Sequence, residues 1–304
     1  MVTTVSQAGM PVDRIPNRRQ PRRRTMTADR VVRLALAAVL LTLPDSASAL
    51  QFFVDVGSSA ANIQGTVDNF RSALGAPNNA STAGPLPGGR REINWDGGGA
   101  LNGSLAGTPF AGFQNRGVIF ETPGSGFLQG PVGPTAALDE LSDVFGTNYS
   151  GTFASFSPVR LFVPQGSNVT VADFSIPGSN GMVRATVAGF GAVFSDVDTG
   201  ATTIEFFDAS DNLITTLTVP GVTGNQTFSF GGILLDPSEP GIASLRITTG
   251  NSPLGVADGG GVDVVAMDDF LFAEPRAVPE PATLFLLGAG LGLVALRWRR
   301  QHRR

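Results

Sequence analysis

The chain has 304 residues, of which 42% are hydrophobic and 15% are charged, so it is long enough for one large domain with a sizeable core. Its 39 glycines and 21 prolines favour a β protein with many turns over a helical one. It contains no cysteine, which excludes disulfide bonds and thiol chemistry. All 21 basic residues are arginines.

Charge is unevenly distributed along the chain. Residues 1–49 and 278–304 are basic, with eight and five arginines against three and one acidic residues. Residues 50–277 carry eight arginines against 21 acidic residues, a balance of −13. An acidic middle argues against nucleic acid as a partner, because a phosphate backbone requires a basic surface. It is compatible with calcium or a neutral polysaccharide.

A short apolar run near the N-terminus predicts a secretory signal peptide. Arg30 and Arg33 precede the ten-residue run LALAAVLLTL, which is too short to anchor a protein in a membrane. Small residues at Ala47 and Ala49 predict cleavage by signal peptidase after Ala49. Met26 opens a signal of ordinary length, residues 26–49. We therefore expect residues 1–25 to come from a misassigned start codon; the alternative is a genuine basic extension.

The last 27 residues have three parts in a defined order. The segment Val278-Pro279-Glu280-Pro281 is expected to be extended, because a residue before proline avoids the helical region. Fifteen apolar, glycine or threonine residues follow and predict a short transmembrane helix. A basic tail ends the chain and places the preceding domain outside the cytoplasm. The helix and its flank include Leu284, Leu296, Arg297, Trp298, Arg299 and Arg300.

This C-terminal pattern resembles the PEP-CTERM sorting signal, whose tripeptide maps to Pro279, Glu280 and Pro281. The resemblance covers residues 278–304. It implies recognition by an exosortase, a membrane transpeptidase-like enzyme of Gram-negative bacteria that make exopolysaccharide. It also implies export across the inner membrane, transient or permanent anchoring by the helix, and delivery to the cell surface or extracellular matrix. The alternative is a plain C-terminal tail anchor.

Residues 50–277 are predicted to form one extracellular β domain. One helix is expected, Asn62–Leu74, in which apolar residues recur at helical spacing. Further along, short strands alternate with turn signals and without helices, which predicts an all-β fold, an antiparallel β-sandwich with jelly-roll topology. The predicted strands cover residues 117–122, 160–164, 169–177, 185–197, 202–209, 212–220, 226–235, 242–250 and 263–273.

The middle also resembles uncharacterised extracellular domains of exosortase-sorted proteins, in the segments VDNFRSALG, RREINWDG, GFGAVFSDVD, IEFFDASDNL and VVAMDDFLF. That resemblance implies no activity. More distantly, MDDFLF is similar to the closing strand of jelly-roll carbohydrate-binding modules, which implies an aspartate that helps to hold a structural calcium ion.

The residue types of the middle restrict its chemistry. The only histidine of the chain is His302, so residues 50–277 contain no histidine, cysteine or lysine. This excludes a Ser-His-Asp triad, a thiol nucleophile, a Schiff-base lysine and a histidine-ligated zinc site. A glycosidase built from two opposed acids remains. No pair stands out, so we predict that the chain is not an enzyme; the candidate acids are Glu92, Asp96, Glu121, Glu205 and Asp208.

Calcium binding is a better-supported role than catalysis for the acidic residues of the middle, because calcium prefers hard oxygen ligands such as carboxylates. The segment SDVDTG places Asp196 and Asp198 on the same side of an extended chain. No EF-hand spacing is present, and the alternative is that the aspartates form turns and strand ends. The candidate calcium ligands are Asp196, Asp198, Asp263, Asp268 and Asp269.

The loop REINWDGGG contains Trp95, the only tryptophan of residues 50–277, between Asn94 and Asp96. An exposed tryptophan beside polar groups would stack on a sugar. The favoured alternative is a tryptophan that closes one end of the core.

The sequence thus predicts an exported surface or matrix protein that binds exopolysaccharide without catalysis. No cofactor is certain, and calcium is the candidate. The alternatives are a structural or adhesive envelope protein with protein partners, and a carboxylate-dependent glycan hydrolase.

Overall fold

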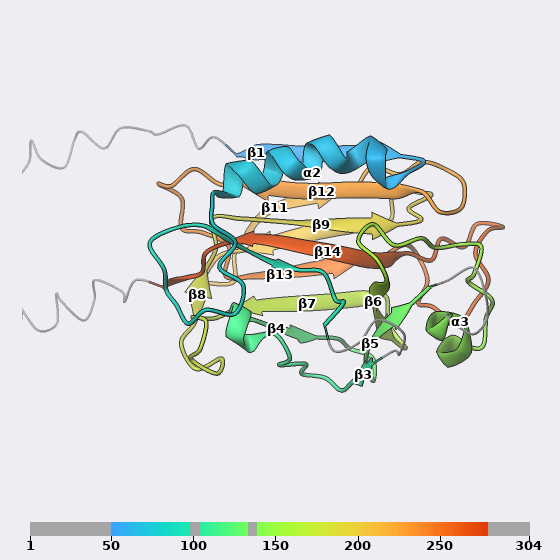
Figure 1. Cartoon of the computed structure of the whole chain (residues 1–304), viewed down its shortest axis with the longest axis horizontal. Helices are drawn as coiled ribbons and strands as arrows, with labels where there is room; N and C mark the ends of the chain where they lie inside the picture. The colour runs from blue at the N-terminus through green and yellow to red at the C-terminus, as the bar shows by residue number, and fades with distance from the viewer. Residues whose placement is uncertain (1–49, 98–103, 133–138, 279–304) are drawn as a thin grey trace, which may run out of the picture. The chain divides into compact units, whose positions relative to one another are not determined.

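A computed structural model describes residues 50–97, 104–132 and 139–278 (Figure 1). The predicted signal peptide, the Pro-Glu-Pro tripeptide and the predicted transmembrane helix lie outside these residues, so their structures stay predictions. No helix in the described part of the chain is long and apolar enough to cross a membrane.

Antiparallel β structure dominates the described residues, as predicted, and helices are few. The larger sheet has eight strands, and the central strand β14 pairs with β9 on one side and with both β6 and β2 on the other. In spatial order its strands are β1 (Gln51–Gly57), β12 (Phe228–Leu234), β9 (Gly189–Ser195), β14 (Ala266–Ala273), β6 (Arg160–Gln165), β5 (Gly126–Pro131) and β3 (Ser104–Ala106), with β2 (Arg90–Ile93) beside β14.

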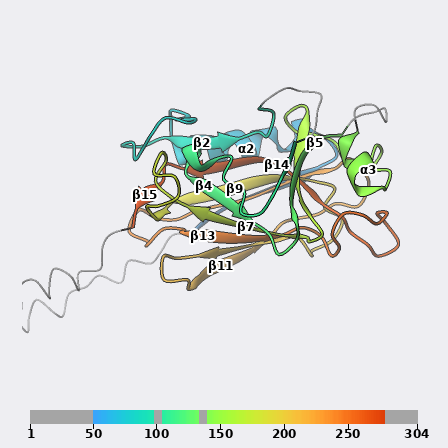
Figure 2. The same ribbon diagram turned by 90° about the horizontal axis from the view of Figure 1, so that it is seen from below.

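A second sheet of five strands faces the first (Figure 2). One hydrophobic cluster contains side chains from both sheets, and the rings of Phe174 and Phe272 meet across it at 5.4 Å. Two short strands, β8 (Ala185–Thr186) and β15 (Arg276–Ala277), pair separately. The order of the second sheet is β11 (Leu213–Thr218), β10 (Thr203–Phe207), β13 (Ser244–Thr248), β7 (Val169–Phe174) and β4 (Val118–Glu121).

The predicted helix is present as α2 (Ala60–Leu74), and it covers β1 and β12 on the outer face of the larger sheet (Figure 1). Its buried side chains are those that the helical spacing predicts: Ile63, Val67, Phe70 and Leu74. A short helix, α3 (Glu140–Phe145), and a 3-10 turn, η1 (Gln114–Arg116), are additional.

Each predicted strand overlaps an observed strand, although the segment 185–197 is divided into β8 and β9. The division arises because Val187 leaves the sheet to exchange backbone hydrogen bonds with Ile242. The prediction missed β1, β2, β3, β5 and β15. Strand β2 is missed because its sequence, RREI, is mostly charged. The jelly-roll topology stays a prediction.

Two glycines set the distance between α2 and the larger sheet. Gly191 of β9 and Gly232 of β12 are register partners beneath Phe70. A Cβ atom on Gly191 would lie 2.8 Å from the Phe70 ring and 2.8 Å from the Phe230 ring. Both rings are packed in the core, so neither has free space to move. The glycines therefore form the hollow that receives the helix.

We expect Gly191→Ala to destabilise the protein by about 1–3 kcal/mol, because the added methyl group overpacks this hollow. The measurement is the midpoint of urea unfolding of the purified protein. The matched control is Gly65→Ala in the middle of α2, where an added Cβ meets no atom within 4 Å. This control should be stabilising by up to about 1 kcal/mol, because alanine is the better helix former. A Gly191→Ala midpoint at or above that of the wild type would show that the hollow tolerates a methyl group.

Candidate functional site

Trp95 lies in the core, not on the surface. Its side chain is fully buried, and its ring stacks on Phe162 at 3.8 Å with the ring planes 2° apart. Phe113 and Phe270 contact the ring edge to face. The indole N–H donates a hydrogen bond to the backbone carbonyl of Asp268 at 2.8 Å. A buried ring offers no face to a sugar, so its burial excludes the stacking role.

Hydrogen bonds of the residues beside Trp95 hold the loop that contains it in one conformation. Trp95 itself has a left-handed backbone with φ of 65°, which a bulky residue adopts only where surrounding contacts compensate the strain. The carboxylate of Asp96 accepts hydrogen bonds from the backbone N–H groups of Val159 and Arg160 at 2.7 and 3.0 Å. Asn94 is exposed and donates to Asp96 at 3.1 Å. Asp96 therefore ties the loop to the start of β6.

Asp268 and Asp269 occupy a β-bulge in β14. The pairing with β9 gains one residue between Met267 and Phe270, so two adjacent acids are accommodated there. Burial raises the pKa of both carboxyl groups, and the negative charge of Asp269 raises the pKa of Asp268 further.

Each oxygen of this carboxylate pair lies within hydrogen-bond distance of a donor group. Asp268 accepts from the backbone N–H of Phe156 at 2.6 Å and from the Ser157 hydroxyl at 3.3 Å. The same hydroxyl lies closer to Asp269, at 2.5 Å, so its one proton is shared mainly with that carboxylate, which also accepts from the guanidinium of Arg71 at 3.2 Å. The pair therefore holds together the segment before β6, helix α2 and β14. Its oxygens already have donors, which argues against these two residues as calcium ligands.

Asp196 differs from every other predicted ligand. It is fully buried, and neither of its carboxylate oxygens makes a hydrogen bond to a described residue. Burial is the main reason that its pKa is raised to about 8. The negative charges of Asp258, Asp198 and Asp263 raise it further. The nearby backbone N–H of Gln226 lowers the pKa in part, but it donates its hydrogen bond to the Thr152 carbonyl at 2.7 Å and not to Asp196. An unpartnered buried carboxylate is costly, so this position calls for a proton or a cation.

The acids around Asp196 are held by the loop that follows β9. Asp263 accepts hydrogen bonds from the backbone N–H and the hydroxyl of Thr199 at 3.0 and 2.6 Å. Asp198 accepts from the backbone N–H of Gly224 at 3.0 Å. Within the described ranges, no three Asp, Glu, His or Cys side chains are arranged to hold a metal ion. Asp198 and Asp263 are thus close enough to Asp196 to raise its pKa, whereas the carboxylates of the bulge pair contact Phe156, Ser157 and Arg71.

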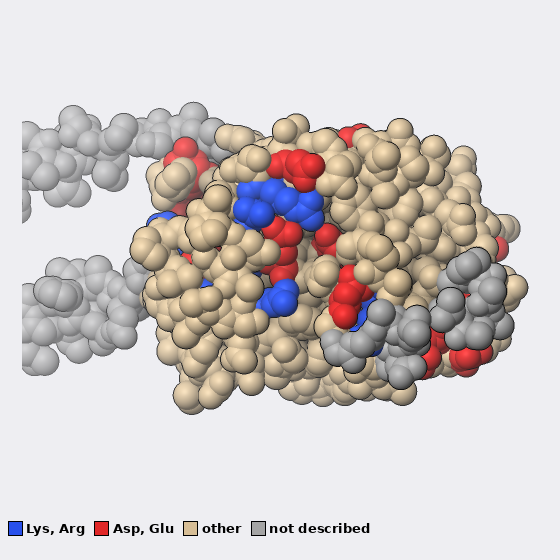
Figure 3. Space-filling view, in the orientation of Figure 1, with Lys and Arg blue, Asp and Glu red and all other residues tan. Residues whose placement is uncertain are grey.

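A charged hollow lies beside the C-terminal end of α2, where arginine and acidic side chains gather on one face of the molecule (Figure 3). Its volume is about 510 Å³. Arg71 forms ion pairs with Asp68 at 2.9 Å and with Glu92 at 3.2 Å, and Arg90 pairs with Glu92 at 2.6 Å. The sequence prediction missed this hollow, although the charged run RREI was visible; the lining residues are Asp68, Arg71, Ser72, Gly75, Ala76 and Arg90.

Comparison with protein-family models matches residues 277–301 to the PEP-CTERM protein-sorting motif. The comparisons with curated proteins and with solved structures found no match. The match implies export, membrane-anchored sorting and processing by an exosortase at the membrane. It begins inside β15, at the end of the described β domain.

We expect Asp196→Asn to stabilise the protein at pH 7.5 in the presence of a chelator. The folded state keeps the Asp196 proton up to a pKa of about 8, whereas an unfolded chain releases it near pH 3.9. Between these values the folded state binds the extra proton, so stability falls as pH rises, by up to about 1.4 kcal/mol per pH unit. Asparagine removes this loss. The measurement is the urea unfolding free energy at pH 5 and at pH 7.5.

The matched control for this experiment is Asp143→Asn, at an exposed position. The control should lose as much stability as the wild type between the two pH values, and Asp196→Asn should lose less. Equal losses in all three proteins would show that Asp196 is already ionised at pH 5 in the folded state.

Proposed function

We propose that this exosortase substrate is a non-enzymatic component of the cell surface or extracellular matrix that binds exopolysaccharide. The sorting motif supports delivery to that location. The charged hollow beside α2 is the observation that carries the binding part of the proposal. Its guanidinium, carboxylate and hydroxyl groups are donors and acceptors suited to sugar hydroxyls. Asp68 is more than half exposed, so a ligand reaches it from solvent.

The state of the candidate acids supports the absence of catalysis. Glu92 lies between two arginines, and Asp96 accepts two backbone hydrogen bonds. Asp208 accepts backbone hydrogen bonds from Ser210 and Asn212, and Glu205 lies 3.5 Å from Arg246. A glycosidase needs one carboxyl group that is free to donate a proton and a second that faces the substrate. Four of the five candidates already serve local contacts.

An adhesive role with protein partners is the second candidate, and strand β1 favours it. β1 is an edge strand of the larger sheet, and its Phe52 and Val54 are about half exposed, at 51% and 46%. An edge strand with apolar side chains is a template for pairing with another chain.

We propose a structural calcium ion at Asp196 as the cofactor. The support is the orphaned carboxylate, which has no donor although it is buried. Calcium also accepts backbone carbonyls and water as ligands, so it does not require three carboxylates. Asp198 and Asp263 are the acids that would complete or neutralise the site. The ion would replace the proton that the raised pKa otherwise retains.

The test of the polysaccharide proposal is retention of the purified full-length protein on exopolysaccharide from the producing bacterium. Ser72→Trp fills the hollow and should reduce retention at least tenfold. Asn69→Trp is the matched control, since Asn69 is exposed on the same helix but does not line the hollow. Equal retention of both variants, or no retention of the wild type, would overturn the proposal.

The test of the calcium proposal is the melting temperature of the same protein in calcium and in chelator. An ion at about 100 times its Kd should raise the melting temperature by about 5 to 10 °C. The rise should be absent in Asp196→Asn and retained in Asp143→Asn. A wild type that melts at the same temperature in both buffers would contradict a calcium site.

A further inference from the structure

The sorting motif follows the folded domain without a linker. Arg276 and Ala277 form β15, which pairs with Thr186 and Ala185 of β8. The backbone N–H of Val278 donates a hydrogen bond to the carbonyl of Arg184 at 3.3 Å. The family match begins at residue 277, so the motif and the domain share residues that are already hydrogen-bonded.

Because no linker separates the motif from the domain, an enzyme bound to the motif must lie close to the domain surface. The Pro-Glu-Pro tripeptide occupies residues 279–281. Even fully extended, three residues reach at most about 11 Å from Val278. An enzyme that grips the tripeptide must therefore bring its own surface against the β8–β15 end of the domain, shown where the described chain ends in Figure 2.

An apolar pair lies at this end. Met182 and Val183 directly precede Arg184, and their exposed fractions are 82% and 46%. Their backbone is not free, because Met182 N–H donates to Ser179 at 3.1 Å and the Val183 carbonyl accepts from Ile176 at 2.8 Å. The loop therefore presents two apolar side chains in a fixed place, and methionine adapts well to a partner's surface.

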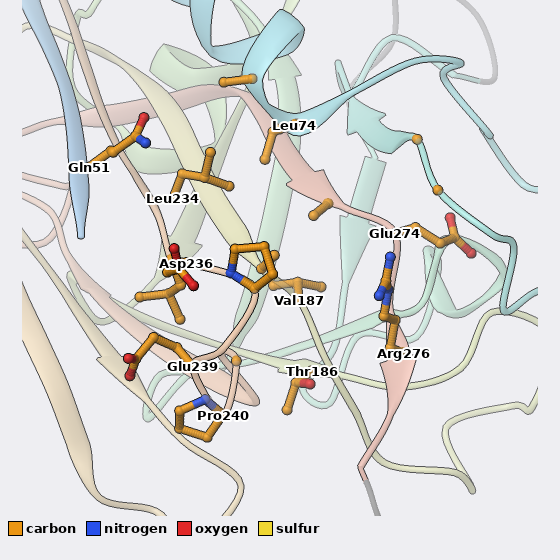
Figure 4. Close-up of a pocket in the computed structure, with 18 residues that line it drawn as sticks. Gln51, Leu74, Thr186, Val187, Leu234, Asp236, Glu239, Pro240, Glu274 and Arg276 are labelled. Atoms are coloured by element: carbon orange, nitrogen blue, oxygen red, sulfur yellow. The ribbon is translucent and has the colours of Figure 1, made fainter. Parts of the chain in front are cut away.

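A hollow of about 340 Å³ with a mixed apolar and polar lining lies on the same end of the molecule (Figure 4). Thr186 and Arg276 line it, and they are the paired residues of β8 and β15. Asp236 and Glu239 add carboxylates from the loop after β12. Hydrogen bonds from Ser238 lower the pKa of Asp236, which keeps it charged. Apolar contacts bordered by polar groups are the usual anatomy of a protein–protein interface.

We infer that Met182, Val183 and the rim of this hollow form a docking surface for the exosortase, so that the domain takes part in recognition of its own sorting signal. This inference rests on the chain being an exosortase substrate. Recognition then has two parts, the tripeptide and a surface of the folded domain within reach of it.

The experiment measures the processed fraction of the full-length protein in the producing bacterium, from the loss of the C-terminal segment on a gel. The double variant Met182→Ser, Val183→Ser should reduce the processed fraction several-fold. The matched control is Leu105→Ser, Val256→Ser, which removes two other exposed apolar side chains, 63% and 44% exposed. Equal processing of the two double variants would overturn the docking surface.

Two further variants separate the possible failures. Insertion of twelve Gly/Ser residues between Val278 and Pro279 keeps every hydrogen bond of the described domain but separates the two parts of the signal, so processing should fall. Unchanged or faster processing would overturn the inference. Glu280→Ala tests the premise alone. If this variant is processed like the wild type, the assignment as an exosortase substrate fails, whatever the docking variants show.

Discussion

The fold depends on hydrogen-bond partners for the acidic residues of strand β14, which is buried along its whole length. Every residue of β14 is buried, including Asp268 and Asp269, and Glu274 follows directly. A buried polar group without a hydrogen-bond partner costs about 1–3 kcal/mol, and more when it is charged, so each of these carboxyl groups needs partners. The donors come from segments far away in the sequence. The hydrogen bonds to these three carboxyl groups therefore help to position helix α2, the segment before β6 and the connector after α2.

Glu274 shows how one buried charge organises a long connector. Arg91 of β2 donates two hydrogen bonds to its carboxylate, both at 2.8 Å. Asn79 and the backbone N–H of Leu86 donate to the same group. Burial alone would raise the pKa of Glu274, but these donors outweigh it and hold the pKa below its usual range. A connector rich in glycine and proline thereby gains a defined position without a regular element of its own.

The contrast with Asp196 separates structural acids from a candidate site. The acids of β14 and Glu274 have donors, and they act as anchors for the chain. Asp196 is equally buried but has no donor for either oxygen, and its electrostatic neighbours are other acids. Such a group adds nothing to stability at neutral pH unless a proton or a cation joins it. Trp95 is buried in the core and cannot contact a sugar, so the proposed sugar site is the charged hollow beside α2.

The sorting signal, helix α2 and the antiparallel β character could be predicted from the sequence, because these depend on local order, composition and periodicity. It also excluded histidine and thiol chemistry, since those residue types are lacking in the domain. The folded structure was needed to show which acids have hydrogen-bond donors, that Trp95 is buried, and that the sorting motif begins on a paired strand. Strand β2 and the partners of β14 were hidden for the same reason: Arg91 and Glu274 are 183 positions apart, and no local pattern reports that their charges meet in the core.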